Sequence, residues 1–182
     1  MSHRAPAMPA EDRRAAIVAA TLPLLLERGA SVSTKQIAEA AGIAEGTIFR
    51  VFPDKDAVVR AAVELAFDPA PAERALSAID RALPFEEQLA EAVRIMQRRL
   101  NDIWRLVSTV GDDVAPRTPP SDFIALAALF GPERDHLRRD PMSAARQLRA
   151  LTLAMSHPML IADSPMSPAE IVSLLLDGIR TR

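Results

Sequence analysis

Apolar residues recur at intervals of three and four along most of the 182-residue chain, with polar and charged residues between them. This spacing is typical of amphipathic helices, because residues three or four apart share one helix face. No run of alternating β-branched residues is long enough to predict a sheet. The pattern predicts an all-α protein, with helices at 11–28, 34–40, 44–51, 55–67, 72–83, 85–110, 121–130, 133–139, 142–156 and 168–180.

Glycine, proline and capping residues set the expected ends of the first helices. Gly29 should end the first helix, and Ser33 or Thr34 should cap the second. Pro53 and Asp54 should end the third helix and cap the fourth. The reason is that the residue before a proline avoids helical geometry, whereas aspartate is a favoured N-cap.

Residues 34–51 combine the residue types that a helix-turn-helix needs, in which two short helices cross closely and the second is free to enter a groove. Ala38 is small where the helices should touch, and Gly42 can adopt the left-handed conformation of the turn. The apolar residues expected beneath are Ile37, Ile43, Ile48 and Val51. The residues left on the outer face are Ala44, Glu45, Thr47 and Arg50. The spacing predicts a unit that reads DNA in the major groove.

The surrounding sequence adds a more specific pattern. An upstream helix ends in LLLERGA, the segment STKQIAEAAGIAEGT follows, and the run continues as GTIFRVFPDKDAVVRAA. Together these segments, which cover residues 15–62, resemble the TetR family of transcriptional repressors. The resemblance implies a ligand-released repressor that binds a near-palindromic DNA operator as a dimer. It also implies a helical C-terminal region that diverges between family members.

The resemblance also implies DNA contacts at individual residues. Thr34 and Lys55 should hold phosphates, and Thr47 should contact the DNA backbone or a base edge. Phosphate favours helix N-termini, which supports this role for a lysine at the start of a helix. The start of the recognition helix should read bases. The expected DNA-binding residues are Thr34, Ala44, Glu45, Thr47, Phe49, Arg50 and Lys55.

Four positions depart from the family's pattern or fit DNA poorly. Phe49 stands where a tyrosine is frequent and lacks its hydroxyl, and Val51 replaces a frequent histidine. Ala44 cannot cap the recognition helix as serine would. Glu45 suits the helix dipole but repels phosphate, so it either accepts a hydrogen bond from cytosine or selects against wrong sites.

Several of these residues also have a structural alternative. Thr34 could be a helix cap and nothing more, and Phe49 could belong to the core together with Phe52. Lys55 could be a solvated surface charge, and Arg50 could contact either a guanine edge or a phosphate.

Three parts of the chain follow from these patterns. Residues 1–10 contain prolines and little apolar periodicity, which predicts a flexible arm. Residues 11–56 should form an N-terminal three-helix helix-turn-helix DNA-binding domain. Residues 57–182 should form a C-terminal helical domain for ligand binding and dimerisation.

Dimerisation and effector binding would explain the C-terminal helices, although their apolar residues could equally form intramolecular core. The stripes expected to pair in a homodimer contain Leu148, Leu151, Met155, Ile171, Leu174, Leu175 and Ile179. The residues expected to line a pocket for a small apolar effector, whose identity the sequence does not indicate, are Met96, Leu100, Trp104, Val107, Phe123, Leu126 and Phe130. Trp104 is the strongest candidate, because a buried indole N–H needs a partner.

Charge and composition narrow the function further. The net charge of −2 excludes a protein that coats nucleic acid nonspecifically, because such binding neutralises many phosphates at once. DNA contacts must therefore be local, with Arg4, Arg13 and Arg14 adding to them. The absence of cysteine excludes disulfides and thiolate metal sites and fits a reducing cytoplasm. The apolar run after Arg14 resembles an export signal, but it lacks a cleavage site and is too short to span a membrane.

No catalytic motif appears in the sequence. HExxH, GxSxG and Gly-rich phosphate loops are absent, and the adjacent Asp112 and Asp113 should point in different directions from a loop. We therefore expect no enzyme activity, cofactor or metal. The alternative function is a helical small-molecule- or partner-binding protein of the same fold that has lost tight DNA binding, which the departures at Ala44 and Phe49 favour.

Overall fold

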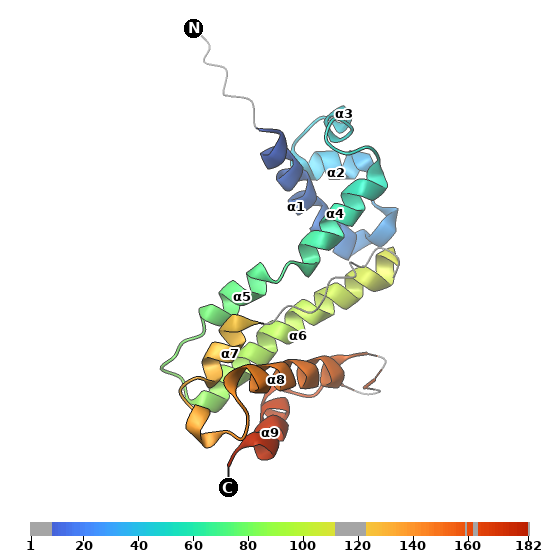
Figure 1. Cartoon of the computed structure of the whole chain (residues 1–182). Helices are drawn as coiled ribbons and strands as arrows, with labels where there is room; N and C mark the ends of the chain where they lie inside the picture. Colours follow the sequence, from blue (N-terminus) through green and yellow to red (C-terminus); the bar gives the residue numbers. More distant parts are fainter. Residues whose placement is uncertain (1–8, 112–122, 159, 162–163, 182) are drawn as a thin grey trace. The chain divides into compact units, whose positions relative to one another are not determined.

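The computed structural model describes residues 9–111, 123–158, 160–161 and 164–181, and Figure 1 shows their helices. The α-helices are α1 (Ala10–Arg28), α2 (Thr34–Ala41), α3 (Glu45–Ile48), α4 (Lys55–Phe67), α5 (Ala70–Ser77), α6 (Phe85–Val110), α7 (Ile124–Phe130), α8 (Pro141–Ser156) and α9 (Pro168–Ile179). Two short 3₁₀ turns are η1 (Gly29–Ser31) and η3 (Arg134–His136). Among the described residues, extended pairing is limited to one isolated bridge between Leu137 and Arg180. The all-α expectation is confirmed.

Some sequence-based expectations concern residues outside the described ranges. Residues 1–8 of the expected arm, including Arg4, belong to this group, as do Asp112 and Asp113. Within the ranges that are described, no helix combines the length and the apolar character needed to cross a membrane.

Most helix bounds agree with the predicted ones, and those of α6 agree at both ends. The second and fourth helices begin where predicted, because Ser33 caps α2 and Asp54 caps α4 through hydrogen bonds from backbone N–H groups. Asp54 Oδ1 accepts from Ala57 N at 2.7 Å. Local capping chemistry therefore determines these ends.

Three predicted helices are shorter than expected. The segment 44–51 is α-helical only over α3, because the next N–H groups bond three residues back, Arg50 N to Thr47 O at 3.2 Å and Val51 N to Ile48 O at 2.9 Å. The segment 72–83 ends at Ser77, and three residues later the Asp80 carboxylate accepts from Ala82 N at 2.9 Å, which favours a turn over a helix. The segment 133–139 is only the 3₁₀ turn η3, since the following residues are extended and Arg138 N donates to Ile179 O at 2.8 Å.

The described residues form two compact units. The first unit contains the chain up to Asp68 together with the end of α6 from Asp102 onward. The second contains residues 69–101 and the described residues from 123 onward. Helix α4 thus lies in the same compact unit as α1, α2 and α3. The domain boundary expected after residue 56 stays a prediction.

The core of the first unit lies between α1, α2, α3, α4 and the end of α6. Its fully buried large residues include Ile17, Leu25, Ile37, Ile48, Phe52 and Leu106. Burying each such side chain stabilises the fold by roughly 1.5–3 kcal/mol. Arg14 in α1 covers the edge of this core, with its guanidinium carbon 4.2 Å from the centre of the Phe52 ring.

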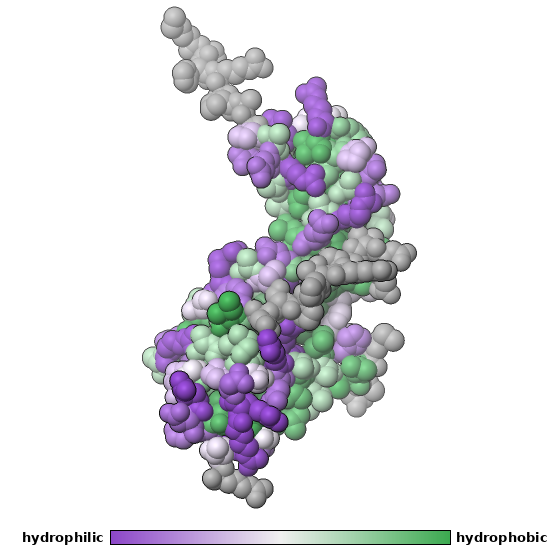
Figure 2. All heavy atoms as spheres, viewed as in Figure 1, coloured by the Kyte–Doolittle hydropathy of each residue, from purple (hydrophilic) through white to green (hydrophobic). Residues whose placement is uncertain are grey.

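The core of the second unit joins α5, α7, α8 and α9 to the first part of α6. Its fully buried large residues include Leu76, Leu89, Leu126, Leu129, Phe130 and Leu148. The rings of Phe85 and Phe130 meet edge to face with centres 5.7 Å apart. In the view of Figure 2, hydrophilic side chains cover much of the surface, and smaller hydrophobic areas lie between them.

Candidate nucleic-acid interface

The start of α2 is built by a capping box. Ser33 Oγ accepts from Gln36 N at 3.2 Å, and the Ser33 N–H donates to Gln36 Oε1 at 2.9 Å. Ser33 is therefore the cap, and the alternative in which Thr34 caps the helix is wrong. Thr34 occupies the first helical position, and its hydroxyl does not cap the helix.

The turn between α2 and α3 has the geometry that the sequence predicts. Gly42 adopts a left-handed conformation with φ 66°, which a residue with a Cβ atom adopts only at a cost. The next residue, Ile43, donates its N–H to Ala38 O at 3.0 Å. These bonds close the turn and direct the chain into the recognition helix.

The recognition helix α3 is four residues long and rests on Ile48, which is fully buried. Ala44 is its N-cap and makes no side-chain hydrogen bond, as predicted. Glu45, Phe49 and Arg50 are exposed, and Thr47 is half-buried. The structure therefore brings most of the expected base-reading residues to one exposed turn of the chain.

The two phenylalanines at the end of this turn have opposite environments. Phe52 is only 1% exposed and belongs to the core, whereas 52% of Phe49 is exposed. The alternative in which both residues form core is wrong for Phe49. An exposed aromatic ring therefore follows α3.

Glu45 and Thr34 form a contact that the sequence analysis missed. Thr34 Oγ1 donates to Glu45 Oε1 at 2.5 Å, which links the first residue of α2 to the first residue of α3. Nothing in the sequence separation of eleven residues indicates this bond. Only the crossing of the two helices brings the side chains together.

Lys55 is not the solvated surface charge that one alternative assumed. Its Nζ donates to the carbonyl oxygens of Ala30 at 3.0 Å and Val32 at 3.1 Å. The ammonium group therefore holds the segment that leads into α2, and one of its three protons remains for a phosphate.

Gly29 is a second structural determinant of that segment. Its φ of 60° is left-handed, and a Cβ atom placed on it would lie 2.9 Å from Thr109 Cβ near the end of α6. The predicted helix end at Gly29 is confirmed, and the close approach explains why the residue has no side chain.

The comparisons with known proteins agree with this geometry. Residues 17–62, which contain the capping box, the turn, α3 and most of α4, match the family described as "Bacterial regulatory proteins, tetR family". This part of the chain is therefore similar to the N-terminal domain of TetR-family regulators.

The solved structures most useful for comparison share this fold at low sequence identity. A TetR-family transcriptional regulator from Haemophilus influenzae is 16% identical, with a TM-score of 0.55 over 94% of this chain and 98% of that one. A TetR transcriptional regulator from Streptomyces coelicolor is 23% identical, with a TM-score of 0.51 over 92% and 98%. A gamma-butyrolactone receptor is 21% identical, with a TM-score of 0.51 over 95% and 91%. No curated protein sequence matches the chain.

The residues expected to line a pocket fall into two groups. Met96, Leu126 and Phe130 are buried in the core of the second unit. Leu100, Trp104, Val107 and Phe123 are half-buried. Phe123 lies 5.5 Å from the guanidinium carbon of Arg149.

The residues expected at a dimer interface also fall into two groups. Leu148, Ile171, Leu175 and Ile179 are buried inside a single chain, as in the core alternative. Leu151 and Met155 are half-buried, whereas 47% of Leu174 is exposed. Of the predicted stripes, Leu174 is the residue most available to a second copy.

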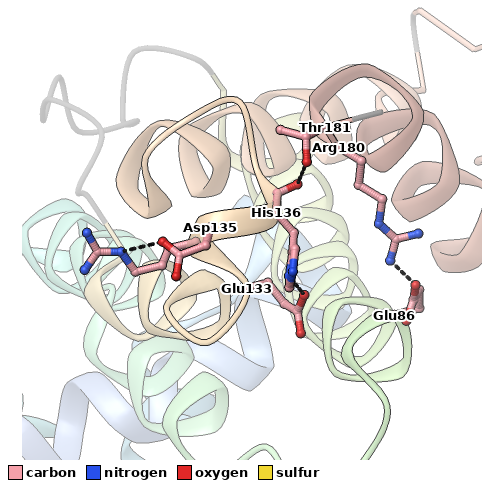
Figure 3. A network of polar contacts seen from close by, with 7 residues as sticks. Glu86, Glu133, Asp135, His136, Arg180 and Thr181 are labelled. Carbon is pink, nitrogen blue, oxygen red and sulfur yellow. Dashed lines mark hydrogen bonds and ion pairs between the residues drawn. The ribbon is translucent and has the colours of Figure 1, made fainter.

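A surface groove of about 250 Å³ lies between the start of α6 and α9. Ala90, Val172 and Leu176 form its apolar lining, and Glu86 and Arg180 pair at its edge, as Figure 3 shows. The hydrogen bond from Arg180 holds the pKa of Glu86 below its ordinary value of 4.5. In the described ranges, no cluster of side chains suits a metal ion.

Proposed function

We propose that this protein is a repressor that binds a near-palindromic operator as a homodimer and leaves it when a small apolar effector binds. Because its target would be chromosomal DNA, we place it in the cytoplasm. The observation that carries the proposal is the exposed turn of Glu45, Phe49 and Arg50 above the fully buried Ile48. A rigid support beneath an exposed recognition helix is what insertion into a major groove requires.

The proposed DNA contacts combine base reading with phosphate binding. Arg50 and Glu45 are the base-reading candidates, because guanidinium and carboxylate groups pair with guanine and cytosine edges respectively. Thr34, Thr47 and Lys55 would contact the backbone, and Phe49 would contact sugar or a thymine methyl group. Ala44 would allow close approach of the chain to the DNA.

The proposed dimer uses the outward faces of α8 and α9. Leu174 and Gly178 are exposed on α9, and Ala150 is exposed on α8. Small residues beside an exposed leucine allow two helices and their copies to approach closely. A two-fold dimer would place the recognition helices about 34 Å apart, which is why the operator should be near-palindromic.

The dimer has a direct test. Leu174→Glu should convert the protein to a monomer at micromolar concentration in light scattering, because a charge in an apolar interface is desolvated without a partner. Ile124→Glu is the matched control, since Ile124 is 71% exposed on α7. A wild-type monomer, or a dimer that survives Leu174→Glu, would contradict the proposal.

The effector site is proposed in the second unit, at the half-buried apolar residues Leu100 and Phe123. A protein that shares this fold is a gamma-butyrolactone receptor, which supports a small-molecule site in such a scaffold. Trp104 is the chain's single tryptophan and follows Leu100 by four residues in α6, so its fluorescence reports on that part of the helix. Titration with a panel of small lactones and fatty acids should change the fluorescence and release bound DNA together.

The alternative function is a helical binding protein that has lost tight DNA binding. Its support is that Thr34 and Lys55 are already hydrogen-bonded within the protein, and that Ala44 leaves α3 without a side-chain cap. Selection of binding sites from a random DNA pool distinguishes the two functions. A recovered palindrome with nanomolar affinity supports the repressor, whereas recovery of no common sequence supports the alternative.

A further inference from the structure

The hydrogen bond between Thr34 and Glu45 connects two residues proposed to face DNA. The distance from Thr34 Oγ1 to Glu45 Oε1 is short, and a hydrogen bond from a hydroxyl to a carboxylate is stronger than one between neutral groups. A threonine hydroxyl carries a single proton. While Glu45 accepts that proton, Thr34 cannot donate to a phosphate.

Glu45 also acts on a phosphate through its charge. A phosphate that approaches the Thr34 hydroxyl comes close to the carboxylate bonded to it, and two like charges a few ångströms apart repel. The contact therefore opposes phosphate binding in two ways, by occupying the donor and by placing a negative charge beside it.

The neighbouring side chains do not replace the occupied donor. The Ser33 hydroxyl donates to Gln36 Oε1 at 3.1 Å within the capping box. The Lys55 ammonium donates to two carbonyl oxygens, so only its third proton is left for a phosphate. Binding of DNA that depends on a phosphate at the start of α2 is therefore weaker while Glu45 holds the Thr34 hydroxyl.

We propose that Glu45 makes binding selective by controlling Thr34. On DNA of mixed sequence, Glu45 retains the Thr34 hydroxyl and repels the nearest phosphate. On the operator, the Glu45 carboxylate instead accepts a hydrogen bond from a base amino group in the major groove. Thr34 is then free to donate to the phosphate, so that one base contact and one phosphate contact form together. This inference rests on the proposed DNA-binding function.

The experiment compares the wild type with Glu45→Gln, Thr34→Val and the double variant. Each is titrated by fluorescence anisotropy with the selected operator and with a mixed-sequence duplex of equal length. Glu39→Gln is the matched control. Glu39 is exposed on α2, and its substitution removes the same charge without changing the bond to Thr34. Circular dichroism melting checks that every variant folds.

Glu45→Gln should bind the mixed-sequence duplex about fivefold more tightly, because like-charge repulsion near a surface is removed. It should bind the operator about tenfold more weakly, because the hydrogen bond from a base amino group then goes to a neutral amide oxygen in place of a charged carboxylate. Thr34→Val should weaken operator binding about fivefold and leave mixed-sequence binding unchanged, since its hydroxyl bonds phosphate only on the operator. In the double variant, Glu45→Gln should increase the affinity for the mixed-sequence duplex by less than it does in the wild type.

Several results would overturn the inference. They are an equal effect of Glu45→Gln on both duplexes, the same effect from Glu39→Gln, and an equal loss from Thr34→Val on both duplexes. If the wild type prefers its operator and any of these results is found, the inference alone fails. If the wild type prefers no sequence, the proposed function fails and the inference fails with it.

Discussion

The two compact units of this protein both have apolar helical cores, but their sequences differ in how specifically they indicate the structure. In the first unit, a run such as STKQIAEAAGIAEGT specifies turn, cap and contact residues one by one. In the second, only the helical spacing of apolar residues is recognisable. Tight packing tolerates many apolar sequences, whereas a left-handed turn or a helix cap tolerates few residue types. The first unit is therefore recognisable from sequence, and the second mainly by its fold.

Removal of one core ring from each unit should have the largest effect. Phe52→Ala and Phe130→Ala should each lower the free energy of unfolding by about 3–5 kcal/mol, because both rings are fully buried. Chemical denaturation followed by circular dichroism measures the loss. Similar values would show that the second unit is packed as tightly as the first.

Phe49→Ala is the control for this pair, since the same ring is removed from an exposed position three residues before Phe52. It should change the free energy of unfolding by less than about 0.5 kcal/mol. A loss as large as that of Phe52→Ala would contradict the exposed placement of Phe49.

The glycines of the first unit should give the next largest effects. Gly29→Ala should cost about 2 kcal/mol, because it combines a left-handed backbone with a close approach to Thr109. Gly42→Ala should cost about 1 kcal/mol, because its φ is also positive but open space surrounds it. Gly46, in α3, has a negative φ and open space.

Denaturant titrations of the three glycine-to-alanine variants should therefore rank Gly29 above Gly42 and Gly42 above Gly46. Alanine at position 46 should be neutral or stabilising, since it replaces glycine inside a helix. An equal cost at positions 29 and 42 would show that contact with Thr109 adds nothing to backbone strain.

Sequence reasoning succeeded where chemistry is local. The Gly42 turn, the Asp54 cap and the whole span of α6 depend on residues within a few positions of each other. It failed at contacts between distant residues, such as Lys55 with Ala30 and Thr34 with Glu45. Spacing along the chain carries no information about which side chains two crossing helices bring together.

The same reasoning could not distinguish burial within one chain from burial between two chains. Leu175 and Leu174 are adjacent in an apolar helix, yet only Leu175 is buried in the single chain. Either role produces the same apolar pattern, because both remove side chains from water. The structure separates them, and leaves Leu174 and its exposed neighbours for the proposed dimer.

Lys55 should have a moderate effect that separates its structural role from its DNA contact. Lys55→Met should lower the free energy of unfolding by about 1 kcal/mol, because the hydrogen bonds to two carbonyl oxygens are lost. It should also weaken binding to all DNA sequences alike and reduce the salt dependence by about one phosphate contact. Anisotropy titrations at several salt concentrations measure the change in DNA affinity and in its salt dependence.

Lys35→Met is the matched control for Lys55, since Lys35 is an exposed lysine on α2. It should leave the free energy of unfolding unchanged. An unaltered salt dependence in Lys55→Met, or a loss confined to one DNA sequence, would contradict the phosphate contact. An unchanged free energy of unfolding would contradict the structural role.

The ion pair of Glu86 and Arg180 in the second unit should have the smallest effect, because both side chains are about half exposed and water weakens their attraction. Arg180 holds the pKa of folded Glu86 below the value of 4.5 that the unfolded chain retains. The folded state therefore favours the charged carboxylate, and this stabilisation is present above pH 4.5 and lost as the pH falls through the folded pKa.

Glu86→Gln should lower the free energy of unfolding at neutral pH by less than about 1 kcal/mol and flatten its decline below pH 4.5. Glu87→Gln, one residue away and also exposed, should leave that decline unchanged, so equal flattening in both variants would show that the pair with Arg180 is not its cause.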